Sequence, residues 1–474
     1  MNRHPGVIVA VLSAAGISVS LMQTLMIPLI PELPVLLDTS AANASWAITA
    51  TLLTAAVATP VFGRLGDMYG AKPMLIVCAA LLTAGSLAAA VSDSLLPVLV
   101  GRALQGFGMP IIPLGISVLR ATVPAHRVGT AMGLMSASLG VGGALGLPLS
   151  AVIADNLDWH ALFWFAAALG VVCGVLFGAL VPRLPAASTD RFDPLGTVLL
   201  AGGLIALLLA ISKGGGWGWT SATTVGLFAT SAAVFAVFAW WQLRCASPIV
   251  DLRATVRRPV LTTNAASVAV GFGLFAMSLI GPQILELPAI TGYGLGLSML
   301  HAGLWLAPGG LAMMVAAPVA ARVAAARGPR FTLVLGSAIV SASYLAGLGL
   351  IDSAWRVCLF NVLVSVGVGF AFASLPALIN AAVPVSETAA ANGINALARA
   401  LGTSISSAVI GAVLAGMTVS VGGHDYPSLG AVRVALVIAA AVAALAALLA
   451  LAIPTSRRPD AAAPELAATA RSAP

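Results

Sequence analysis

The chain has 474 residues, of which 60% are hydrophobic and only 8% are charged, and its mean hydropathy is +1.06. A soluble protein has roughly 25% charged residues, so this composition excludes a water-soluble globular protein and predicts a surface covered by lipid. The net charge of +7 does not indicate a nucleic-acid partner, because the basic residues stand between apolar stretches and are explained by membrane topology. The four cysteines lie far apart, which predicts neither a disulfide framework nor a metal site.

The apolar stretches are long enough to be membrane-spanning helices. A helix of about 20 residues crosses the bilayer core and satisfies its own backbone polar groups. By this length, the sequence predicts fourteen spans, near residues 7–30, 45–63, 73–91, 96–119, 128–154, 161–181, 194–212, 221–241, 262–285, 297–321, 331–351, 355–381, 391–418 and 430–453. The first stretch is too long for a signal peptide, and no small-residue cleavage site follows it. The predicted fold class is therefore all-α integral membrane.

The distribution of basic residues predicts the orientation of the spans. With the N-terminus in the cytoplasm, every Lys and Arg lies on the cytoplasmic side except Arg102, Lys213, Arg356 and Arg433. A missed or an invented span would invert this asymmetry from that point onward. We therefore expect a multi-pass protein of the cell membrane with both termini in the cytoplasm.

The chain repeats itself once at a nearly constant spacing. The loop at residues 63–72 is echoed at 321–330, and Gly142 is echoed by Gly402. Two halves in the same orientation are a known transporter architecture, with the substrate between them near the bilayer midplane. We expect two six-helix bundles related by a pseudo-two-fold axis, with two further helices inserted between them. The predicted domains are an N-terminal bundle at 1–190, an insert at 191–257, a C-terminal bundle at 258–453 and a disordered cytoplasmic tail at 454–474.

The connection between the second and third spans combines charge and glycine in a short segment. Asp67 ends the second span at the membrane face, where its carboxylate can pair with a helix N-terminus or an arginine. Gly63 and Gly70 permit close packing and a tight turn. We interpret this loop as a conformational latch. The alternative is a loop whose charges only set the orientation of the spans.

Two motifs resemble a known family. The loop residues that carry the resemblance are Gly63, Leu65, Asp67, Gly70 and Lys72, and they resemble the loop signature of the major facilitator superfamily. The segment Arg102-x-x-Gln105-Gly106-x-Gly108 resembles its fourth-span signature. With fourteen spans, residues 7–453 resemble the drug:proton antiporter family that has a two-helix central insert. Met68 and Ala71 stand where this family usually has basic residues, so the resemblance implies a latch with fewer partners.

The resemblance implies a proton-carrying carboxylate inside the membrane, but the usual aspartate of the first span is missing. The segment Met22-Gln23-Thr24 stands in its place. The candidates for proton coupling are Glu32, at the outer end of the first span, and Glu286, which ends the first span of the second half. The resemblance also implies that Arg102 faces the cavity and modulates this carboxylate. The alternatives are acids solvated at the outer rim and an arginine that snorkels to the headgroups.

Polar side chains inside the spans are candidates for the cavity lining. Asn395 and Arg399 belong to a polar stripe in the thirteenth span, which either lines a water-filled path or packs against the loop at residues 386–387. The other candidates for substrate contact are Gln23, Gln105, Gln283 and His301. A lone histidine near a helix start is more often only hydrogen-bonded.

The fifth span contains a dense run of glycine and proline at residues 140–148. Both residue types let a helix bend and approach a neighbour closely. Gly142, Gly146 and Pro148 resemble the antiporter signature of the family in altered form, because Leu147 stands where proline usually follows the glycine. Helix packing without a role in exchange is the alternative.

These observations favour a secondary transporter that exports small amphipathic or hydrophobic compounds in exchange for protons. Few fixed charges and many Leu, Met, Phe and Ala residues predict an adaptable apolar cavity. The alternatives are a facilitator of a polar metabolite, which needs several buried polar groups in both halves, and a polytopic membrane enzyme, which needs clustered Asp, His or Glu. The sequence has no such cluster and no Walker A pattern, so we expect no enzyme, no ATP-driven transport and no cofactor. The expected partners are a small-molecule substrate, protons and the lipid bilayer, and the expected state is a monomer.

Overall fold

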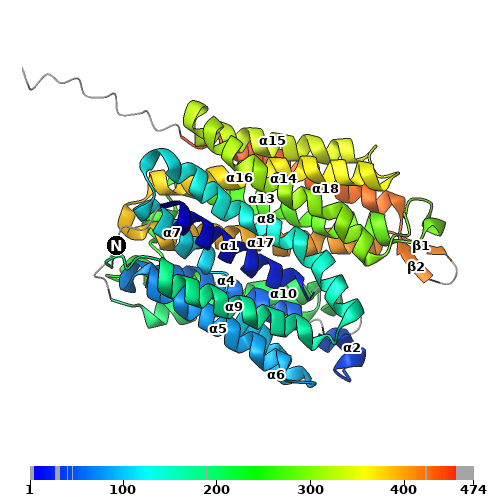
Figure 1. Ribbon diagram of the computed structural model, residues 1–474, viewed down its shortest axis with the longest axis horizontal. Coiled ribbons are helices and arrows are strands. Elements are labelled where there is room, and N and C mark those ends of the chain that lie inside the picture. Colours follow the sequence, from blue (N-terminus) through cyan, green and yellow to red (C-terminus); the bar gives the residue numbers. More distant parts are fainter. Residues whose placement is uncertain are drawn as a thin grey trace, which may run out of the picture.

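Long apolar helices run side by side along the longest axis of the molecule (Figure 1). The structure is a computed structural model that describes residues 5–26, 33–39, 41–44, 46–186, 191–421 and 424–454. In these residues, 14 helical segments are long and apolar enough to cross a membrane. The fourteen spans predicted from the sequence are therefore confirmed.

The N-terminal half contains six of these spans. They are α1 (Pro5–Thr24), α4 (Trp46–Tyr69), α5 (Ala71–Ala90), the pair α6 (Leu95–Gly106) and α7 (Ile111–Thr122), α8 (Ala125–Asn156) and α9 (His160–Leu180). Two single-turn helices, α2 (Leu33–Leu36) and α3 (Ala41–Ala44), lie between α1 and α4.

The fourth span is interrupted at a point where the sequence predicts one continuous helix. The backbone N–H groups of Phe107, Gly108 and Met109 donate to carbonyl groups three residues earlier, which is the tighter 3₁₀ pattern. Pro110 follows directly and has no N–H to donate to a continuing α-helix. This segment therefore divides the span into α6 and α7.

The C-terminal half also contains six spans. They are α13 (Arg258–Glu286), α14 (Met299–Arg327), α15 (Pro329–Gly347), α16 (Ala354–Ala382), α17 (Thr388–Gly416) and α18 (Leu429–Leu451). The short elements of this part of the chain are α12 (Leu252–Thr255), η2 (Ala289–Thr291) and η3 (Val385–Glu387).

A small antiparallel hairpin joins the last two spans, and the all-α prediction missed it. The strand β1 (Thr418–Val421) pairs with β2 (His424–Pro427), with Val419 opposite Tyr426. Thr418, Val419, Val421 and Tyr426 belong to the residue types that favour an extended backbone. The helix of the thirteenth span therefore ends at Gly416, two residues before the predicted end at residue 418.

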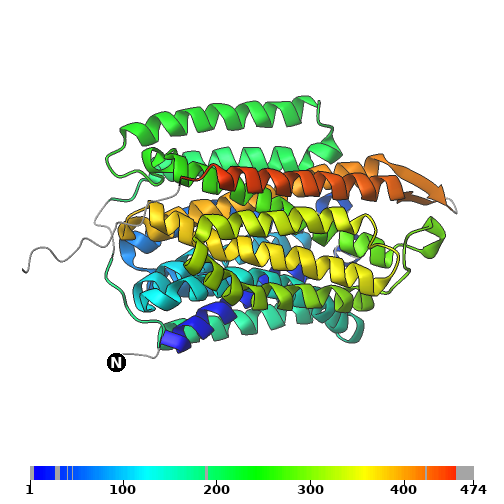
Figure 2. The same ribbon diagram turned by 90° about the horizontal axis from the view of Figure 1, so that it is seen from above.

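The insert between the halves consists of α10 (Pro194–Trp217) and α11 (Ala222–Arg244). Leu200, Leu204 and Leu208 of α10 share an apolar cluster with Ala56 of α4 and Leu397 of α17. The helix α11 lies outside α10, at the edge of the molecule (Figure 2). The insert therefore packs through α10 on one helix of each half.

Each half has its own apolar core, and equivalent glycines confirm the repeat. One large cluster of buried side chains is drawn mainly from α13, α14, α15, α16 and α18, and another mainly from α1, α5, α7, α8 and α9. A Cβ atom at Gly142 would collide with the Ile17 carbonyl of α1, and one at Gly402 with the Val268 carbonyl of α13. The fifth span of each half therefore packs on the first span of the same half at the same point.

The two ends of the helix bundle carry different elements. The loop end carries residues 64–72, the start of α1 and the end of α18, and the hairpin end carries β1 and β2 (Figures 1 and 2). Gly70 and Gly328 precede α5 and α15 at the loop end with φ angles of +91° and +89°, which only glycine adopts without strain. The echo between the two loops is thus also an echo in backbone conformation.

Candidate functional site

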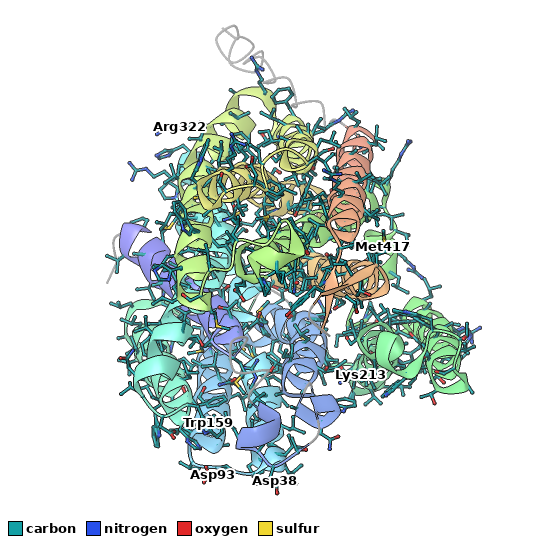
Figure 3. All side chains as sticks on the ribbon, turned by 90° about the vertical axis from the view of Figure 1, so that its right-hand side faces the viewer. Asp38, Asp93, Trp159, Lys213, Arg322 and Met417 are labelled. Atoms are coloured by element: carbon teal, nitrogen blue, oxygen red, sulfur yellow. The ribbon has the colours of Figure 1, made fainter. Side chains whose placement is uncertain are left out.

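A cavity of about 460 Å³ lies between the two halves. Its lining comes from α1, α4, α7 and α8 of the N-terminal half, from α13, α14, α16 and α17 of the C-terminal half, and from Leu208 of the insert. Figure 3 views the molecule from the hairpin end, with the two halves above and below and the insert beside them, where Lys213 is labelled. The volume falls within the range of small-molecule sites.

The cavity extends from the hairpin end toward the middle of the bundle. Gln23 near the end of α1, Glu286 at the end of α13 and Met299 at the start of α14 line its outer part. Ala396 and Arg399 of α17 line its inner part. Most of the lining is apolar, and Glu286 and Arg399 are its only charged residues among those that the structure describes.

A buried polar network holds Arg399 at the inner part of the cavity. Its Nη1 donates to Asn395 Oδ1 over 2.7 Å, and its Cζ lies 5.2 Å from the ring centroid of Phe372. Asn395 Nδ2 donates in turn to Asn264 Oδ1 at 2.9 Å and to Ser267 Oγ at 2.6 Å, both on α13. Arg399 is only 7% exposed, so α13 and α17 together fix the direction of its side chain.

The other predicted cavity residues divide into two groups. Gln23 lines the cavity, whereas Asn395 is fully buried directly behind Arg399. Gln283 is half-buried outside the lining, and His301 is exposed with its Nδ1 2.7 Å from Ser298 Oγ at the start of α14. Glu32 lies outside the described residues.

Arg102 and Gln105 are buried away from the cavity, contrary to the expectation that both face it. The guanidinium of Arg102, 3% exposed, donates to the Ala47 carbonyl at 3.1 Å and to Gln105 Oε1 at 2.7 Å. Gln105 Nε2 donates to Ser86 Oγ at 2.8 Å. These bonds connect α4, α5 and α6 inside the N-terminal half. Gln105 is a partner from the same helix, whereas the Ala47 carbonyl and the Ser86 hydroxyl come from other helices and are brought to this site only by the tertiary fold.

The loop end is closed by bonds between the halves. Asp67, 2% exposed, accepts hydrogen bonds from the backbone N–H groups of Ala389 at 3.1 Å and Ala390 at 2.8 Å. These groups belong to the first turn of α17, where backbone donors have no partner inside the helix. The positive end of the helix dipole also favours a carboxylate at this position. The pairing of Asp67 with a helix N-terminus was one of the two possibilities that the sequence left open.

Close packing accompanies this bond. A Cβ atom at Gly63 would lie 2.8 Å from the carbonyl oxygen of Ala389, and one at Gly393 would lie 2.9 Å from that of Thr59. The backbones of α4 and α17 therefore touch at the loop end. Leu65 packs beside them on the apolar cluster shared with the insert.

Lys72 bonds within its own half, whereas a latch residue would bond the other half. Its Nζ donates to the Gly178 carbonyl at 2.7 Å and so connects α5 with α9 inside the N-terminal half. The echo loop at 321–330 has Ala325 where Asp67 stands in the first loop. The carboxylate contact between the halves is therefore not repeated at the equivalent position.

Arg120 is a second contact between the halves, and the sequence analysis missed it. Its Nη1 donates to Thr388 Oγ1 at 2.5 Å and its Nη2 to the Asn380 carbonyl at 2.9 Å. The residue stands in the last turn of α7, so one arginine from the N-terminal half bonds the end of α16 and the start of α17. An arginine at the end of an apolar span was visible in the sequence, but its partners lie more than 250 residues away.

The glycine- and proline-rich run of α8 packs on both of its neighbours. Gly142 and Gly146 face α1, where Cβ atoms would collide with Ile17 and Thr24. Pro148 faces α14, where a Cβ atom at Gly303 would lie 3.0 Å from its nitrogen. The helix α8 is therefore held between a helix of its own half and a helix of the other half.

Two helical bundles that enclose a central cavity and are bonded together at one end have the architecture of a membrane transporter. A sequence model of the Major Facilitator Superfamily matches residues 12–407 and 287–473. The chain belongs to this superfamily, whose members are transporters.

Similar proteins of assigned function are resistance and export proteins. The lincomycin resistance protein of Listeria monocytogenes is 26% identical over 419 residues, which cover 86% of this chain and 87% of that protein. The tetracenomycin C resistance and export protein of Streptomyces glaucescens is 29% identical over 388 residues, which cover 80% of this chain and 70% of that protein.

Solved structures share the fold at low sequence identity. The proton:xylose symporter XylE superposes with a TM-score of 0.67 at 13% identity, over 95% of this chain and 96% of that one. The human organic anion transporter MFSD10 superposes with a TM-score of 0.66 at 15% identity, over 94% of this chain and 100% of that one. The two-bundle fold predicted from the sequence is confirmed.

Proposed function

We propose that the protein exports small amphipathic or hydrophobic compounds from the cell in exchange for protons, by alternating access. The observation that carries this proposal is the combination of a mostly apolar cavity between the halves with a loop end that Asp67 bonds shut. The names of the similar resistance and export proteins support efflux as the physiological direction.

The proposed orientation places the loop end and both termini in the cytoplasm. The basic residues that flank the spans support this orientation through the positive-inside rule. The described conformation is then outward-facing, because the cavity reaches the hairpin end while the cytoplasmic end is bonded. Opening the loop end requires the breakage of the Asp67 and Arg120 contacts and a rotation of one half against the other.

We propose residues 1–190 and 258–453 as the two units that move against each other. We also propose that the protein is a monomer and that it has no enzymatic activity.

Glu286 is the group that we propose to carry the proton. It is the only carboxylate in the lining among the described residues, and it is half-buried at the outer part of the cavity. Protons from outside reach it in the outward-facing state without crossing the closed loop end. Arg102 bonds Ala47 and Gln105 and does not contact Glu286. A role of Arg102 in proton coupling therefore stays a prediction.

Proteoliposomes with an imposed pH gradient and a fluorescent hydrophobic dye test the proposal. Dye flux that drives protons in the opposite direction is the expected result. Glu286→Gln should abolish the dependence of dye flux on the pH gradient and leave the protein folded in the membrane. Asp352→Asn is the matched control, because Asp352 is an exposed acid that pairs with Arg356 away from the cavity. Dye flux without any counterflow of protons refutes antiport, and full coupling in Glu286→Gln excludes this residue as the carrier.

A further inference from the structure

The charge of Arg399 has no counterion in the described part of the chain. Its hydrogen-bond partner Asn395 and its ring partner Phe372 are both neutral, and no ion pair between described residues includes it. Arginine keeps its charge in proteins, and a buried charge is costly unless another charge or a set of hydrogen bonds compensates it. Arg399 also lines the cavity, which Arg102 does not, and an ionisable residue inside a membrane span that faces a cavity is a candidate contact for a substrate or an ion.

Neither Glu286 nor Asp67 can supply the missing charge. Gly271 of α13 touches the backbone of Arg399, and Glu286 lies 15 residues further along α13, about 22 Å away at the helical rise. Asp67 contacts Ala389 and Ala390 of α17, which lie 10 and 9 residues before Arg399, or about 14–15 Å along the helix. Both distances exceed the reach of an ion pair, and Asp67 already bonds Ala389 and Ala390.

The network behind Arg399 directs its guanidinium into the cavity. Asn395 Nδ2 donates both of its hydrogen bonds to α13. Its Oδ1 is therefore the atom that remains to accept from Arg399. A guanidinium has five N–H donors in a planar fork, and the bond to Asn395 uses only one nitrogen. A carboxylate entering the cavity could accept two parallel N–H bonds from the remaining donors, and a phenolate could accept them with its single oxygen.

The remainder of the lining suits an apolar body attached to that anionic group. Leu274, Phe275, Met277 and Met313 contribute apolar surface between Arg399 and the hairpin end. Methionine and aromatic side chains adapt to ligands of different shape. The charge thus lies at the inner part of a cavity whose walls are otherwise mostly apolar.

We propose that the substrates of this transporter are amphipathic organic anions, and that Arg399 binds their carboxylate or phenolate group. This inference rests on the proposed function, since it assigns a chemical class to the compounds that the cavity carries. The competing class is lipophilic cations, which would pair with Glu286. We expect Arg399 to determine the charge of the substrate more strongly than Glu286 does, because Arg399 is only 7% exposed. Glu286 is only half-buried, at the outer part of the cavity.

The test compares three naphthalene compounds of the same ring and similar length: naphthylacetate, naphthylacetamide and naphthylethylammonium. Their binding to the purified protein in lipid nanodiscs is measured by calorimetry, with empty nanodiscs as the baseline. We expect the anion to bind at least roughly tenfold more tightly than the neutral amide, as charge-assisted hydrogen bonds predict. Equal affinity for anion and amide, tighter binding of the cation, or no binding of any probe would each overturn the proposal.

Variants of Arg399 show whether this residue causes the preference. Arg399→Gln should reduce the anion-to-amide affinity ratio to about one while the affinity for the amide changes less than about twofold, because only the charge-assisted bond is lost. Arg399→Lys should retain part of the ratio, since lysine keeps the charge without the planar fork. Arg356→Gln, an exposed arginine outside the cavity, should leave the ratio unchanged. An undiminished ratio in Arg399→Gln refutes the role of Arg399.

A second measurement applies if the Arg399 variants do not fold. Ala396→Cys places a thiol in the lining near Arg399, and the wild-type arginine remains in place. Naphthylacetate should slow the maleimide labelling of this cysteine at concentrations where the amide does not, and equal protection by both compounds contradicts the proposal. Binding preference is measured without a pH gradient, so a failure here leaves proton-coupled efflux standing, and a failure of the flux assay leaves the binding preference standing.

Discussion

The carboxylate of Asp67 lies 2.8 Å from the backbone nitrogen of Ala390, although 323 residues separate them in the sequence. Asp67 ends the second span of one half, and Ala390 begins the fifth span of the other half, so the bond exists only while the halves meet at the loop end. The acceptors are the two carboxyl oxygens of Asp67, and the donors are N–H groups at a helix start that have no partner inside the helix. Asp67 of the loop thus connects the two halves at the loop end, and the role of the loop as a latch stays a prediction.

Asp67→Ala should open the loop end more often. Hydrogen bonds to a charged group contribute roughly 1.5–3 kcal/mol, so their loss should raise the open fraction about tenfold or more. The reporter is Met132→Cys, which replaces a side chain that is buried against Asn380 of the other half. Its labelling by an impermeant maleimide in inverted vesicles should accelerate. Lys72→Ala is the matched control, because Lys72 bonds only within its own half, and equal acceleration by both variants argues against the latch.

Arg120 and Thr388 should act as a coupled pair at the same end. Arg120→Gln and Thr388→Val each remove the 2.5 Å bond between Nη1 and Oγ1, and each should accelerate labelling of the same reporter. A direct pair gives a double variant whose effect is smaller than the sum of the single effects, by roughly 0.5–3 kcal/mol. Additive effects in this double-mutant cycle would show that the bond does not contribute to closure.

Gly142→Ala should destabilise the protein, since a Cβ atom there collides with the backbone of α1. Overpacking of this kind costs roughly 1–3 kcal/mol. Gly411→Ala is the control, because its Cβ atom would meet no atom within 4 Å and alanine is the better helix former. Thermal unfolding in detergent should show a lower midpoint for Gly142→Ala and an unchanged or higher midpoint for Gly411→Ala. Equal midpoints would mean that α1 and α8 separate at little cost.

Arg102→Ala should reduce the yield of folded protein more than Glu286→Gln does. The truncation leaves the Ala47 carbonyl and Gln105 Oε1 without their buried donor, and each unsatisfied buried group costs roughly 1–3 kcal/mol. Size-exclusion profiles and thermal midpoints of the two variants provide the comparison. A stable, monodisperse Arg102→Ala protein that has lost only proton coupling would instead support the functional role that the sequence motif implies.

The sequence determined those features of the protein that depend on local composition and periodicity. Apolar stretches of bilayer length predicted the fourteen spans, because a span must satisfy its backbone within one continuous helix. The equivalence of Gly142 and Gly402 was visible for the same reason, since each packs on a helix of its own half. The hairpin at 418–427 was missed, because a few alternating residues next to a long apolar helix carry little signal.

The tertiary structure alone decided which polar side chains meet. Arg102 and Arg399 look alike in the sequence, as single arginines in apolar spans with an amide three or four residues away. The fold buries Arg102 among α4, α5 and α6, and it directs Arg399 into the cavity with only neutral partners. Likewise, the partners of Asp67 and Arg120 are backbone groups and a hydroxyl in the other half, which no local pattern marks. Spans are specified within a helix, whereas the latch and the cavity are specified by contacts between helices far apart in the chain.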